Sequence, residues 1–197
     1  MKDELRKAMR RRIGCISNPV YLPVGILEEC LPSHTRTLFA FLSHGHEIGT
    51  EPLIDNALAR GITVAVPRVT GDDLAFYQIS SSTGPFETGA FGIREPPRTA
   101  NRLYPADPDS KRIRLEFPLT IVIPALAFSP QGDRLGRGAG FYDRFLSRFL
   151  NEHRDKRSQT TLVGACHSCQ IVPTVPVESH DIPVDCLLTE KSCIVCV

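Results

Sequence analysis

The chain has 197 residues, enough for a domain with a well-buried core, and its 42% hydrophobic and 23% charged residues are ordinary for a globular protein. The formal net charge of +1 removes any bulk electrostatic argument for nucleic acid or a membrane surface as a partner. No apolar run approaches the roughly 20 residues that span a bilayer, and the charged N-terminus lacks a signal peptide's apolar stretch, so we expect a cytoplasmic protein.

The first predicted element is a short helix over residues 2–12. Leu5 and Met9 lie on its inward face, and basic residues gather on the opposite face. On composition alone, that basic face is simply solvated. Residues 17–32 give a weaker pattern, in which a helix over 24–31 is one option.

A β–α–β unit follows. Residues 37–42 form a continuous apolar run, typical of a buried parallel strand, and residues 62–67 form the next strand. Between them, Thr50 is a candidate N-cap for a helix that Gly61 ends. This order predicts a parallel sheet, in which ligands bind beyond the carboxyl ends of the strands, where Glu47 falls. A loop carboxylate is, however, most often only solvated.

The middle of the chain carries weaker signals. Residues 74–79 alternate enough to predict a strand nearer the edge of the sheet. Residues 91–96 have the pattern of an ordered loop, in which Phe91 either offers aromatic surface to a flat ring or packs as a satellite core residue. Residues 97–111 are polar and rich in proline, which favours a surface connection.

The most informative segment is a glycine-rich loop between a strand over 119–124 and a helix that begins near Phe141. Four glycines let the backbone approach a ligand closely: Gly132, Gly136, Gly138 and Gly140. Arg134 and Arg137 add two guanidinium groups, whose geometry matches phosphate oxygens. A glycine loop before a helix N-terminus is a ready anion site, because free N–H groups and the helix dipole point toward the ligand.

The same loop leaves alternatives open. It is neither a Walker A loop nor a dinucleotide fingerprint, so a tight turn with solvated arginines is a competing interpretation. Asp143, in the first turn of the helix, could hold a metal beside a phosphate or only interact with the helix dipole.

The C-terminal part predicts two more strands, over 161–165 and 186–188, with a loop between them that carries His180 and Asp181. The seven cysteines are an odd number without a secretory signal, which argues against a disulfide framework. Two pairs have C-x-x-C spacing, Cys166 with Cys169 and Cys193 with Cys196. They predict either a zinc site or buried free thiols.

Together these elements predict an α/β fold. We expect one three-layer domain over residues 1–197, with a mainly parallel sheet and helices on both faces.

Residues 134–144, Arg-Leu-Gly-Arg-Gly-Ala-Gly-Phe-Tyr-Asp-Arg, resemble the signature of the 5-formyltetrahydrofolate cyclo-ligase family, also called 5,10-methenyltetrahydrofolate synthetase. Further segments resemble this family in the same order: Lys2-x-x-Leu5-Arg6 and residues 41–43, 47–50, 92–96, 124–128 and 180–185. Two positions depart from it. The family usually has an acidic residue in place of Gly49, and an aromatic residue, often Tyr, in place of Phe141.

The resemblance implies ATP-dependent cyclisation of 5-formyltetrahydrofolate to 5,10-methenyltetrahydrofolate, with release of ADP and phosphate, via phosphorylation of the formyl oxygen. It implies a reduced folate as the small-molecule partner, and we expect a monomer or weak homodimer. ATP would be bound by Lys2, Arg6, Arg134, Leu135, Gly136, Arg137, Gly138, Ala139, Gly140, Phe141 and Tyr142.

The resemblance also implies a set of folate-binding residues: Leu42, Glu47, Phe91, Arg137, Gly138, Ala139, Gly140 and Phe141. Mg²⁺ would be held by Asp143 and Asp181, and the catalytic residues would be Arg134, Arg137 and Tyr142.

Two other hypotheses stay open. Gly49 makes a non-catalytic or altered-specificity folate- or nucleotide-binding relative plausible, and the two C-x-x-C pairs allow a zinc or redox protein.

Overall fold

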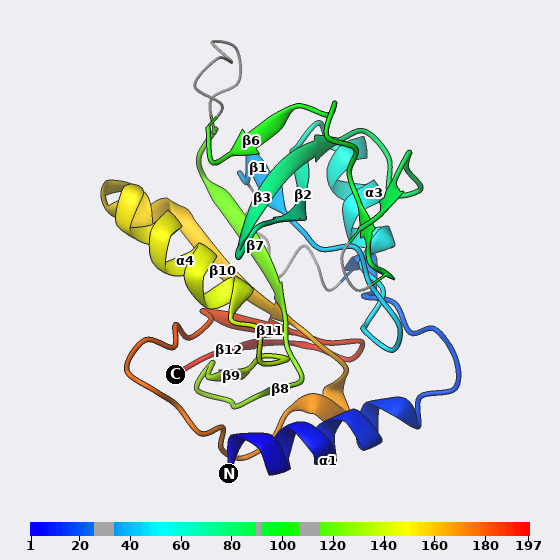
Figure 1. The fold of residues 1–197 in the computed structure, drawn as a ribbon, viewed down its shortest axis with the longest axis vertical. Coiled ribbons are helices and arrows are strands. Elements are labelled where there is room, and N and C mark those ends of the chain that lie inside the picture. The colour runs from blue at the N-terminus through cyan, green and yellow to red at the C-terminus, as the bar shows by residue number, and fades with distance from the viewer. Residues whose placement is uncertain (26–33, 90–91, 107–114) are drawn as a thin grey trace.

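The computed structural model describes residues 1–25, 34–89, 92–106 and 115–197 (Figure 1). Its centre is an eight-stranded sheet in the order β12-β11-β10-β7-β1-β2-β3-β6. The strands of this sheet are β1 (Thr37–Phe39), β2 (Thr63–Thr70), β3 (Asp73–Ile79), β6 (Arg102–Tyr104), β7 (Leu119–Pro124), β10 (Thr160–Ala165), β11 (Cys186–Leu188) and β12 (Cys193–Val195). Two short antiparallel pairs lie outside it: β4 (Glu87–Thr88) with β5 (Arg94–Glu95), and β8 (Ala127–Phe128) with β9 (Arg134–Leu135).

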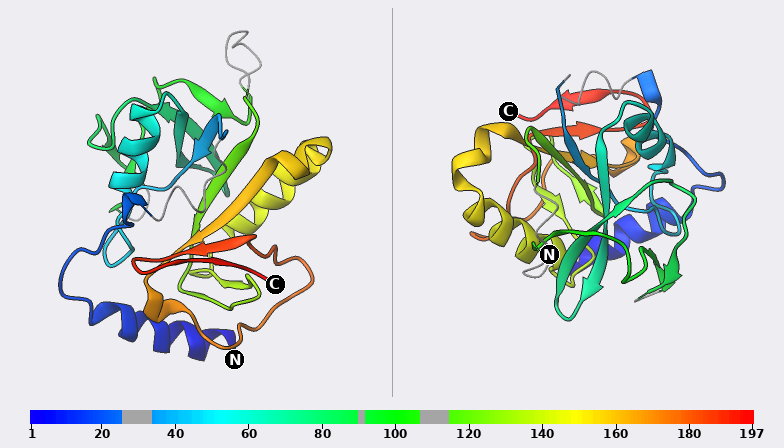
Figure 2. Two further views of the ribbon diagram at one scale, coloured as in Figure 1. Left: turned by 180° about the vertical axis from the view of Figure 1, so that it is seen from behind. Right: turned by 90° about the horizontal axis from the view of Figure 1, so that it is seen from above.

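The inner strands from β11 to β2 pair in parallel, whereas β12, β3 and β6 add antiparallel edges. Helix α3 (Glu51–Ala59) covers one face, and helix α4 (Phe141–Glu152) covers the other; Figure 2 shows them on opposite sides of the strands from above. Neighbouring residues of β1 point to different layers, since Leu38 packs with the residues beneath α3 and Phe39 with those beneath α4. The predicted α/β fold with a mainly parallel sheet is confirmed.

Helix α1 (Lys2–Gly14) lies at one end of the sheet, below the β8–β9 pair and beside the 3₁₀ turn η3 (Ser168–Gln170) (Figure 1). Its buried residues Met9 and Ile13 pack against Leu126, Leu135 and Val172. The apolar residues whose spacing predicted this helix therefore form the face that packs against the rest of the protein.

Several predicted elements differ in detail. Thr50 precedes α3 but its hydroxyl does not cap the helix; it donates instead to the Phe41 carbonyl and fixes the intervening loop. The surface connection predicted over 97–111 contains strand β6, whose Leu103 is buried. The sequence did not indicate this strand, because three residues between prolines are too few to show a periodic pattern. The helix predicted over 24–31 falls largely outside the described residues.

Strand β2 runs on past Pro67 to Thr70, because its extension forms an antiparallel pair with β3. A 3₁₀ segment, η2 (Arg154–Gln159), follows α4. Among the described residues, no helix is long and apolar enough to cross a membrane.

Candidate functional site

The glycine-rich loop joins β9 to α4 and depends on left-handed backbone at two positions. Gly138 has φ +110° and Gly140, the residue before α4, has φ +70°, a region that side chains with a Cβ rarely adopt. The loop therefore requires glycine at these two positions for its shape, and the partly exposed N-terminus of a twelve-residue helix lies beside it.

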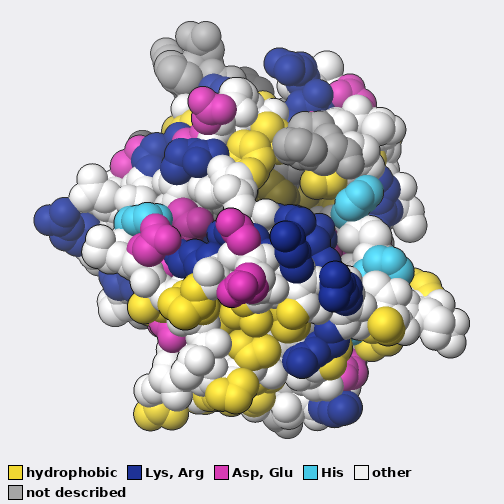
Figure 3. Space-filling view, turned by 60° about the horizontal axis from the view of Figure 1, so that its bottom comes forward, with side chains coloured by type: hydrophobic (Ala, Val, Ile, Leu, Met, Phe, Trp, Pro, Cys, Tyr) yellow, Lys and Arg dark blue, Asp and Glu magenta, His cyan; other side chains and the backbone are white. Residues whose placement is uncertain are grey.

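Helix α1 lies against this loop. Arg6 donates from Nε to the Gly136 carbonyl at 3.2 Å, and Arg10 donates from Nη2 to the Arg137 carbonyl at 3.2 Å. Figure 3 shows lysine and arginine side chains together with acidic ones on this face of the molecule. The structure thus brings Arg6, from the start of the chain, to the glycine loop.

Lys2 reaches the loop that follows η3. Its Nζ lies 2.9 Å from Asp181 Oδ2 and 3.0 Å from Glu178 Oε1. Burial opposes charging of either partner, but the hydrogen bonds and charges between them outweigh it, so the pKa of Lys2 is raised and that of Asp181 is lowered. Both groups are therefore charged at neutral pH.

Arg137 and Glu47 connect the glycine loop to the loop after β1. Arg137 donates to Glu47 Oε1 from Nη2 at 2.7 Å and from Nε at 3.2 Å. The other carboxylate oxygen, Oε2, accepts the backbone N–H of His44 at 3.0 Å. The Arg137 side chain is 55% exposed, so it keeps contact with solvent while it holds Glu47.

Arg134 has different surroundings. Its side chain is 2% exposed, forms an ion pair with Asp143 and donates from Nε to the Ile182 carbonyl at 3.2 Å. Asp143, at the start of α4, therefore already has a cationic partner. Arg134 also brings the segment that contains Asp181 toward the N-terminus of α4.

Tyr142 places a buried polar atom in this region. Its hydroxyl is shielded from solvent and has no hydrogen-bond partner among the described residues, although the ring is only partly buried. Burial raises the pKa of the Tyr142 phenol, the charge of Glu47 raises it further, and that of Arg134 opposes the rise. The hydroxyl is thus a neutral donor without a partner among the described residues, and it is close enough to Glu47 and Arg134 to feel both charges.

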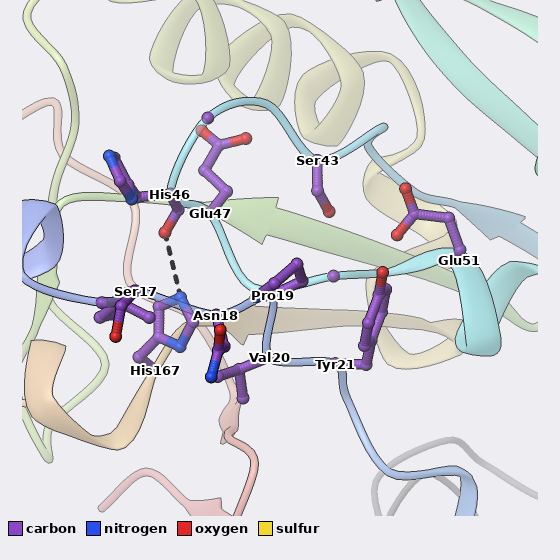
Figure 4. A pocket seen from close by; sticks show the side chains of 13 residues that line it. Ser17, Asn18, Pro19, Val20, Tyr21, Ser43, His46, Glu47, Glu51 and His167 are labelled. Atoms are coloured by element: carbon purple, nitrogen blue, oxygen red, sulfur yellow. Dashed lines mark hydrogen bonds between the residues drawn. The ribbon is translucent and has the colours of Figure 1, made fainter.

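A pocket of about 330 Å³ opens beside Glu47 (Figure 4). Its walls come from residues 16–21, from the loop and helix start after β1, and from His167. Tyr21 and Glu51 lie on one side of it and His46 and Glu47 on the other. Sequence reasoning missed Tyr21, because residues 17–32 have no clear periodicity, and Glu51, because it begins a helix, where an acidic residue is common.

The remaining predicted residues have varied surroundings. Leu42 and Leu135 are buried in the core, Ala139 is exposed, and Phe141 is partly buried with the Arg144 guanidinium 5.3 Å from its ring centroid. Phe91 lies outside the described residues.

The four cysteines of the two C-x-x-C pairs differ in burial and bonding. Cys166 and Cys169 are free, Cys193 is disulfide-bonded and Cys196 is free. The sequence argued against a disulfide framework; Cys193 nevertheless forms a disulfide, while five other cysteines are free. Burial raises the pKa of the Cys166 thiol, which disfavours the thiolate that zinc requires.

In the described ranges, no group of three or more His, Cys, Asp or Glu side chains is close enough together to hold a metal. A cation here would need ligands from its substrates as well as from the protein, which is the usual pattern for Mg²⁺ with phosphates.

Comparison with known proteins gives a consistent result. A sequence model of the 5-formyltetrahydrofolate cyclo-ligase family matches residues 26–190. The 5-formyltetrahydrofolate cyclo-ligase of Mycolicibacterium smegmatis is 33% identical over 168 residues, covering 81% of this chain and 76% of the relative. The enzyme of that name from Escherichia coli K12 is 31% identical over 157 residues, covering 78% of each chain.

Solved structures agree. The NMR structure of Aquifex aeolicus 5,10-methenyltetrahydrofolate synthetase superposes with a TM-score of 0.66 at 28% identity, covering 98% of this chain and 92% of that one. A 5,10-methenyltetrahydrofolate synthetase from Mycoplasma pneumoniae gives a TM-score of 0.64 at 17% identity, covering 96% of this chain and 99% of that one, which supports the fold alone.

Proposed function

The chain belongs to the 5-formyltetrahydrofolate cyclo-ligase family, and on that premise we propose that it converts 5-formyltetrahydrofolate to 5,10-methenyltetrahydrofolate at the expense of ATP. The observation that carries this proposal is the Arg137–Glu47 contact, which joins the glycine-rich loop to the wall of the pocket. A reaction between a nucleotide and a second substrate needs two such sites side by side.

The chemistry accounts for the absence of an obvious nucleophile. The formyl oxygen of the substrate is an amide oxygen, a poor leaving group that the neighbouring N10 amine cannot displace. Transfer of the γ-phosphoryl group forms an oxygen–phosphorus bond at the formyl oxygen while the bond to ADP breaks. N10 then forms a bond to the formyl carbon, loses its proton, and phosphate departs with the former formyl oxygen.

Phosphoryl transfer demands positioning and charge neutralisation more than covalent chemistry by the protein. The proposed phosphate-binding groups are the backbone N–H groups of the glycine loop, the exposed Arg137 guanidinium, and Arg6 and Lys2 from α1. Both side chains already have partners in this region, since Arg6 donates to the Gly136 carbonyl and Lys2 donates to Asp181.

Asp143 and Asp181 would hold Mg²⁺. Their oxygen ligands suit this ion, and two carboxylates with phosphate oxygens and water would complete its shell. When bound, the ion would neutralise phosphate charge. The protein's own part is to orient these carboxylates, through Arg134 at Asp143 and through Lys2 at Asp181.

Glu47 would hold the folate, and Tyr142 would donate its buried hydroxyl to an oxygen of the reacting groups. The hydroxyl would then gain the hydrogen bond it lacks among the described residues, so a ligand at this point would remove an energetic cost of the free protein. Ring closure is intramolecular, and holding the folate in one conformation would supply much of its acceleration.

The test is direct. The protein is mixed with 5-formyltetrahydrofolate, ATP and Mg²⁺, and the methenyl chromophore is followed by absorbance with ADP release measured in parallel. We expect stoichiometric methenyl product and ADP, and neither product when ATP is omitted. ATP hydrolysis without cyclisation, or folate binding without turnover, would contradict the proposal and favour a non-catalytic relative.

A further inference from the structure

Residues 44–47 form the loop that carries Glu47. His44, Gly45 and His46 are exposed. Within the loop, the Glu47 N–H donates to the His44 carbonyl at 3.3 Å, and Glu47 Oε2 accepts the His44 N–H at 3.0 Å. These contacts give the loop its local shape, but they do not fix it against the rest of the protein.

Among the described residues, hydrogen bonds join this loop to other segments at two points. One is the contact between Arg137 and the Glu47 carboxylate. At the other, His167 Nε2 donates to the His46 carbonyl at 3.0 Å, the bond drawn as a dashed line in Figure 4. Because Arg137 is also a proposed phosphate-binding group, His167 is the contact that holds the loop independently of the nucleotide.

The neighbours of His167 define its protonation. The side chain is buried and accepts the Gln170 N–H, which only Nδ1 can do while Nε2 faces the His46 carbonyl. The proton of the neutral ring is therefore on Nε2, the donor to the loop. Both ring nitrogens are used within the protein, so the imidazole has no capacity left for a ligand and acts only through the groups it holds.

The turn that carries this histidine is itself fixed. The His167 N–H donates to Gln170 Oε1 at 2.8 Å, and Gln170 Nε2 donates to the Ala125 carbonyl at 2.8 Å. On the other side, the Ser168 N–H donates to Glu190 Oε2 at 2.8 Å. The imidazole thus has a base that is tied both to the segment after β7 and to the C-terminal part of the chain.

We propose that His167 is a positioning residue for folate binding, which fixes the backbone beside Glu47 so that its carboxylate stays on the pocket wall. The inference rests on the proposed function of Glu47 and adds to it the group that orients this residue. It also gives the first C-x-x-C segment a role that does not depend on its thiols, because His167 lies between Cys166 and Cys169.

Two substitutions separate the two hydrogen bonds of the imidazole. In His167→Asn, the amide oxygen takes the place of Nδ1 and keeps the acceptor for the Gln170 N–H, but the side chain is too short to reach the His46 carbonyl. In His167→Gln, the amide nitrogen keeps the donor to His46, but the acceptor is lost. His153→Gln is the matched control, because its Nδ1 lies 3.0 Å from the Phe149 carbonyl, away from the pocket lining.

Binding is measured as the Kd for 5-formyltetrahydrofolate by calorimetric titration without ATP, and kinetics give KM for each substrate. His167→Asn should raise Kd and KM for the folate about tenfold, with KM for ATP within about twofold of wild type. His167→Gln and the control should bind the folate within about twofold of wild type. The thermal midpoint of His167→Gln should fall by about 2–4 °C from loss of the cap. Normal folate binding by His167→Asn, or equal weakening by both His167 variants, would overturn the inference.

A double variant tests whether His167 acts through Glu47. In a Glu47→Gln background, adding His167→Asn should cause no further loss of folate affinity, because the group that His167 positions has already been removed. A direct contact with the folate, or a general loss of order, would instead add its full tenfold effect to that of Glu47→Gln. Additive losses would therefore overturn the inference.

Hydrogen exchange tests the geometry without any folate. The amides of His44 and Glu47 are hydrogen-bonded inside the loop and report its opening. They should exchange about tenfold faster in His167→Asn and at the wild-type rate in His167→Gln; unchanged exchange in His167→Asn would overturn the inference. If His167→Asn does not fold, His167→Gln decides alone: wild-type folate affinity supports the inference, and a tenfold loss overturns it.

The two proposals fail in different ways. If the wild type neither binds nor cyclises the folate, the proposed function fails, while hydrogen exchange still measures whether His167 fixes the loop. If the wild type does both and His167→Asn matches it, only the role of His167 is wrong.

Discussion

Arg134 and Arg137 belong to the same short loop, yet their side chains are suited to different tasks. Arg134 is almost fully buried and serves Asp143 and the Ile182 carbonyl, whereas Arg137 is more than half exposed and reaches Glu47. At the residue scale, Arg134 orders the loop and Arg137 is the group that remains accessible to a phosphate.

This contrast predicts that the two alanine substitutions separate stability from ATP use. Arg137→Ala should raise KM for ATP about 10- to 100-fold, from loss of charge-assisted contacts worth roughly 1.5–3 kcal/mol, with a normal thermal midpoint. Arg134→Ala should reduce the free energy of unfolding by about 3–5 kcal/mol, because it leaves Asp143 unpaired. Chemical denaturation measures the free energy of unfolding, and steady-state kinetics measure KM for ATP. A destabilised Arg137→Ala with a normal KM, together with a stable Arg134→Ala with a raised KM, would contradict this division of roles.

Tyr142→Phe gives a second residue-scale prediction. The substitution removes a buried hydroxyl that has no partner among the described residues, so the unliganded protein should be as stable as wild type or more stable, by up to about 1–3 kcal/mol. Turnover should fall if the hydroxyl bonds to a reacting oxygen. Thermal unfolding and kcat test this together, and a less stable variant with normal kcat would show a structural role.

Residue chemistry was only partly visible in the sequence. The glycines and arginines of residues 132–140 indicated an anion site, but nothing in their spacing distinguishes the buried Arg134 from the exposed Arg137. That difference arises because Arg134 lies on β9, facing Ile182, which is 48 residues further along the chain. Contacts of this range leave no periodic signal.

At the scale of elements, α1 is the part on which the candidate site depends most. It supplies Arg6 and Arg10 to the glycine loop and Lys2 to Asp181, and it is attached by Met9 and Ile13. Its amphipathic pattern predicted the helix correctly. The partners of its basic face could not be predicted, because a solvated face and a ligand-binding face have the same composition.

The Lys2–Asp181 pair should make the attachment of α1 depend on pH. The pKa of Asp181 is lowered from 3.8, so its contribution is present above about pH 3.8 and is lost as the pH falls through the folded-state value. The pKa of Lys2 is raised from 10.5, so its contribution is present below pH 10.5 and is lost as the pH rises further.

Hydrogen exchange of the α1 amides measures this effect. Wild type should show constant opening of α1 between about pH 4 and pH 10 after correction for intrinsic exchange, and extra opening below that range. Asp181→Asn should be more open throughout and should lack the change near the acidic end. An identical pH profile in the variant would rule out this pair as the cause.

The apolar face of α1 predicts a separate effect on stability. Met9 is 1% exposed, so Met9→Ala should reduce the free energy of unfolding by about 2–5 kcal/mol. Lys7→Ala, on the exposed face, is the control and should change it by no more than about 0.5 kcal/mol. Denaturant titration distinguishes them, and equal stability of both variants would mean that α1 is not part of the cooperative unit.

At the scale of the whole molecule, the sheet was predictable where strands are long and buried. The apolar runs at 62–67 and 119–124 lie in β2 and β7, and the run at 37–42 contains β1, which ends at Phe39; each of these inner strands has a parallel neighbour. The two-residue strands β4, β5, β8 and β9 could not be predicted, because two residues cannot show a period. The pocket also escaped prediction, since its wall includes residues 17–21 from a stretch without a pattern.

Metal removal tests the competing zinc hypothesis on the intact protein. Because burial raises the pKa of the Cys166 thiol and Cys193 is disulfide-bonded, we expect far less than one zinc per chain by mass spectrometry of the purified protein. Dialysis against a chelator should abolish cyclisation but leave the thermal midpoint unchanged, and Mg²⁺ should restore activity. Stoichiometric zinc whose removal unfolds the protein would reinstate the zinc site.

The position of α1 has a consequence for synthesis on the ribosome. Lys2 is synthesised well before its partner Asp181, which lies 179 residues later in the chain. At about 5–20 residues per second, roughly 10 to 35 seconds separate the two. Met9 and Ile13 are covered completely only when residues from Leu126 to Val175 have been made, and until then an isolated helix of 13 residues is only marginally stable in water. The nascent chain should therefore keep an open N-terminal segment, accessible to chaperones or proteases, until nearly the whole sequence has been translated.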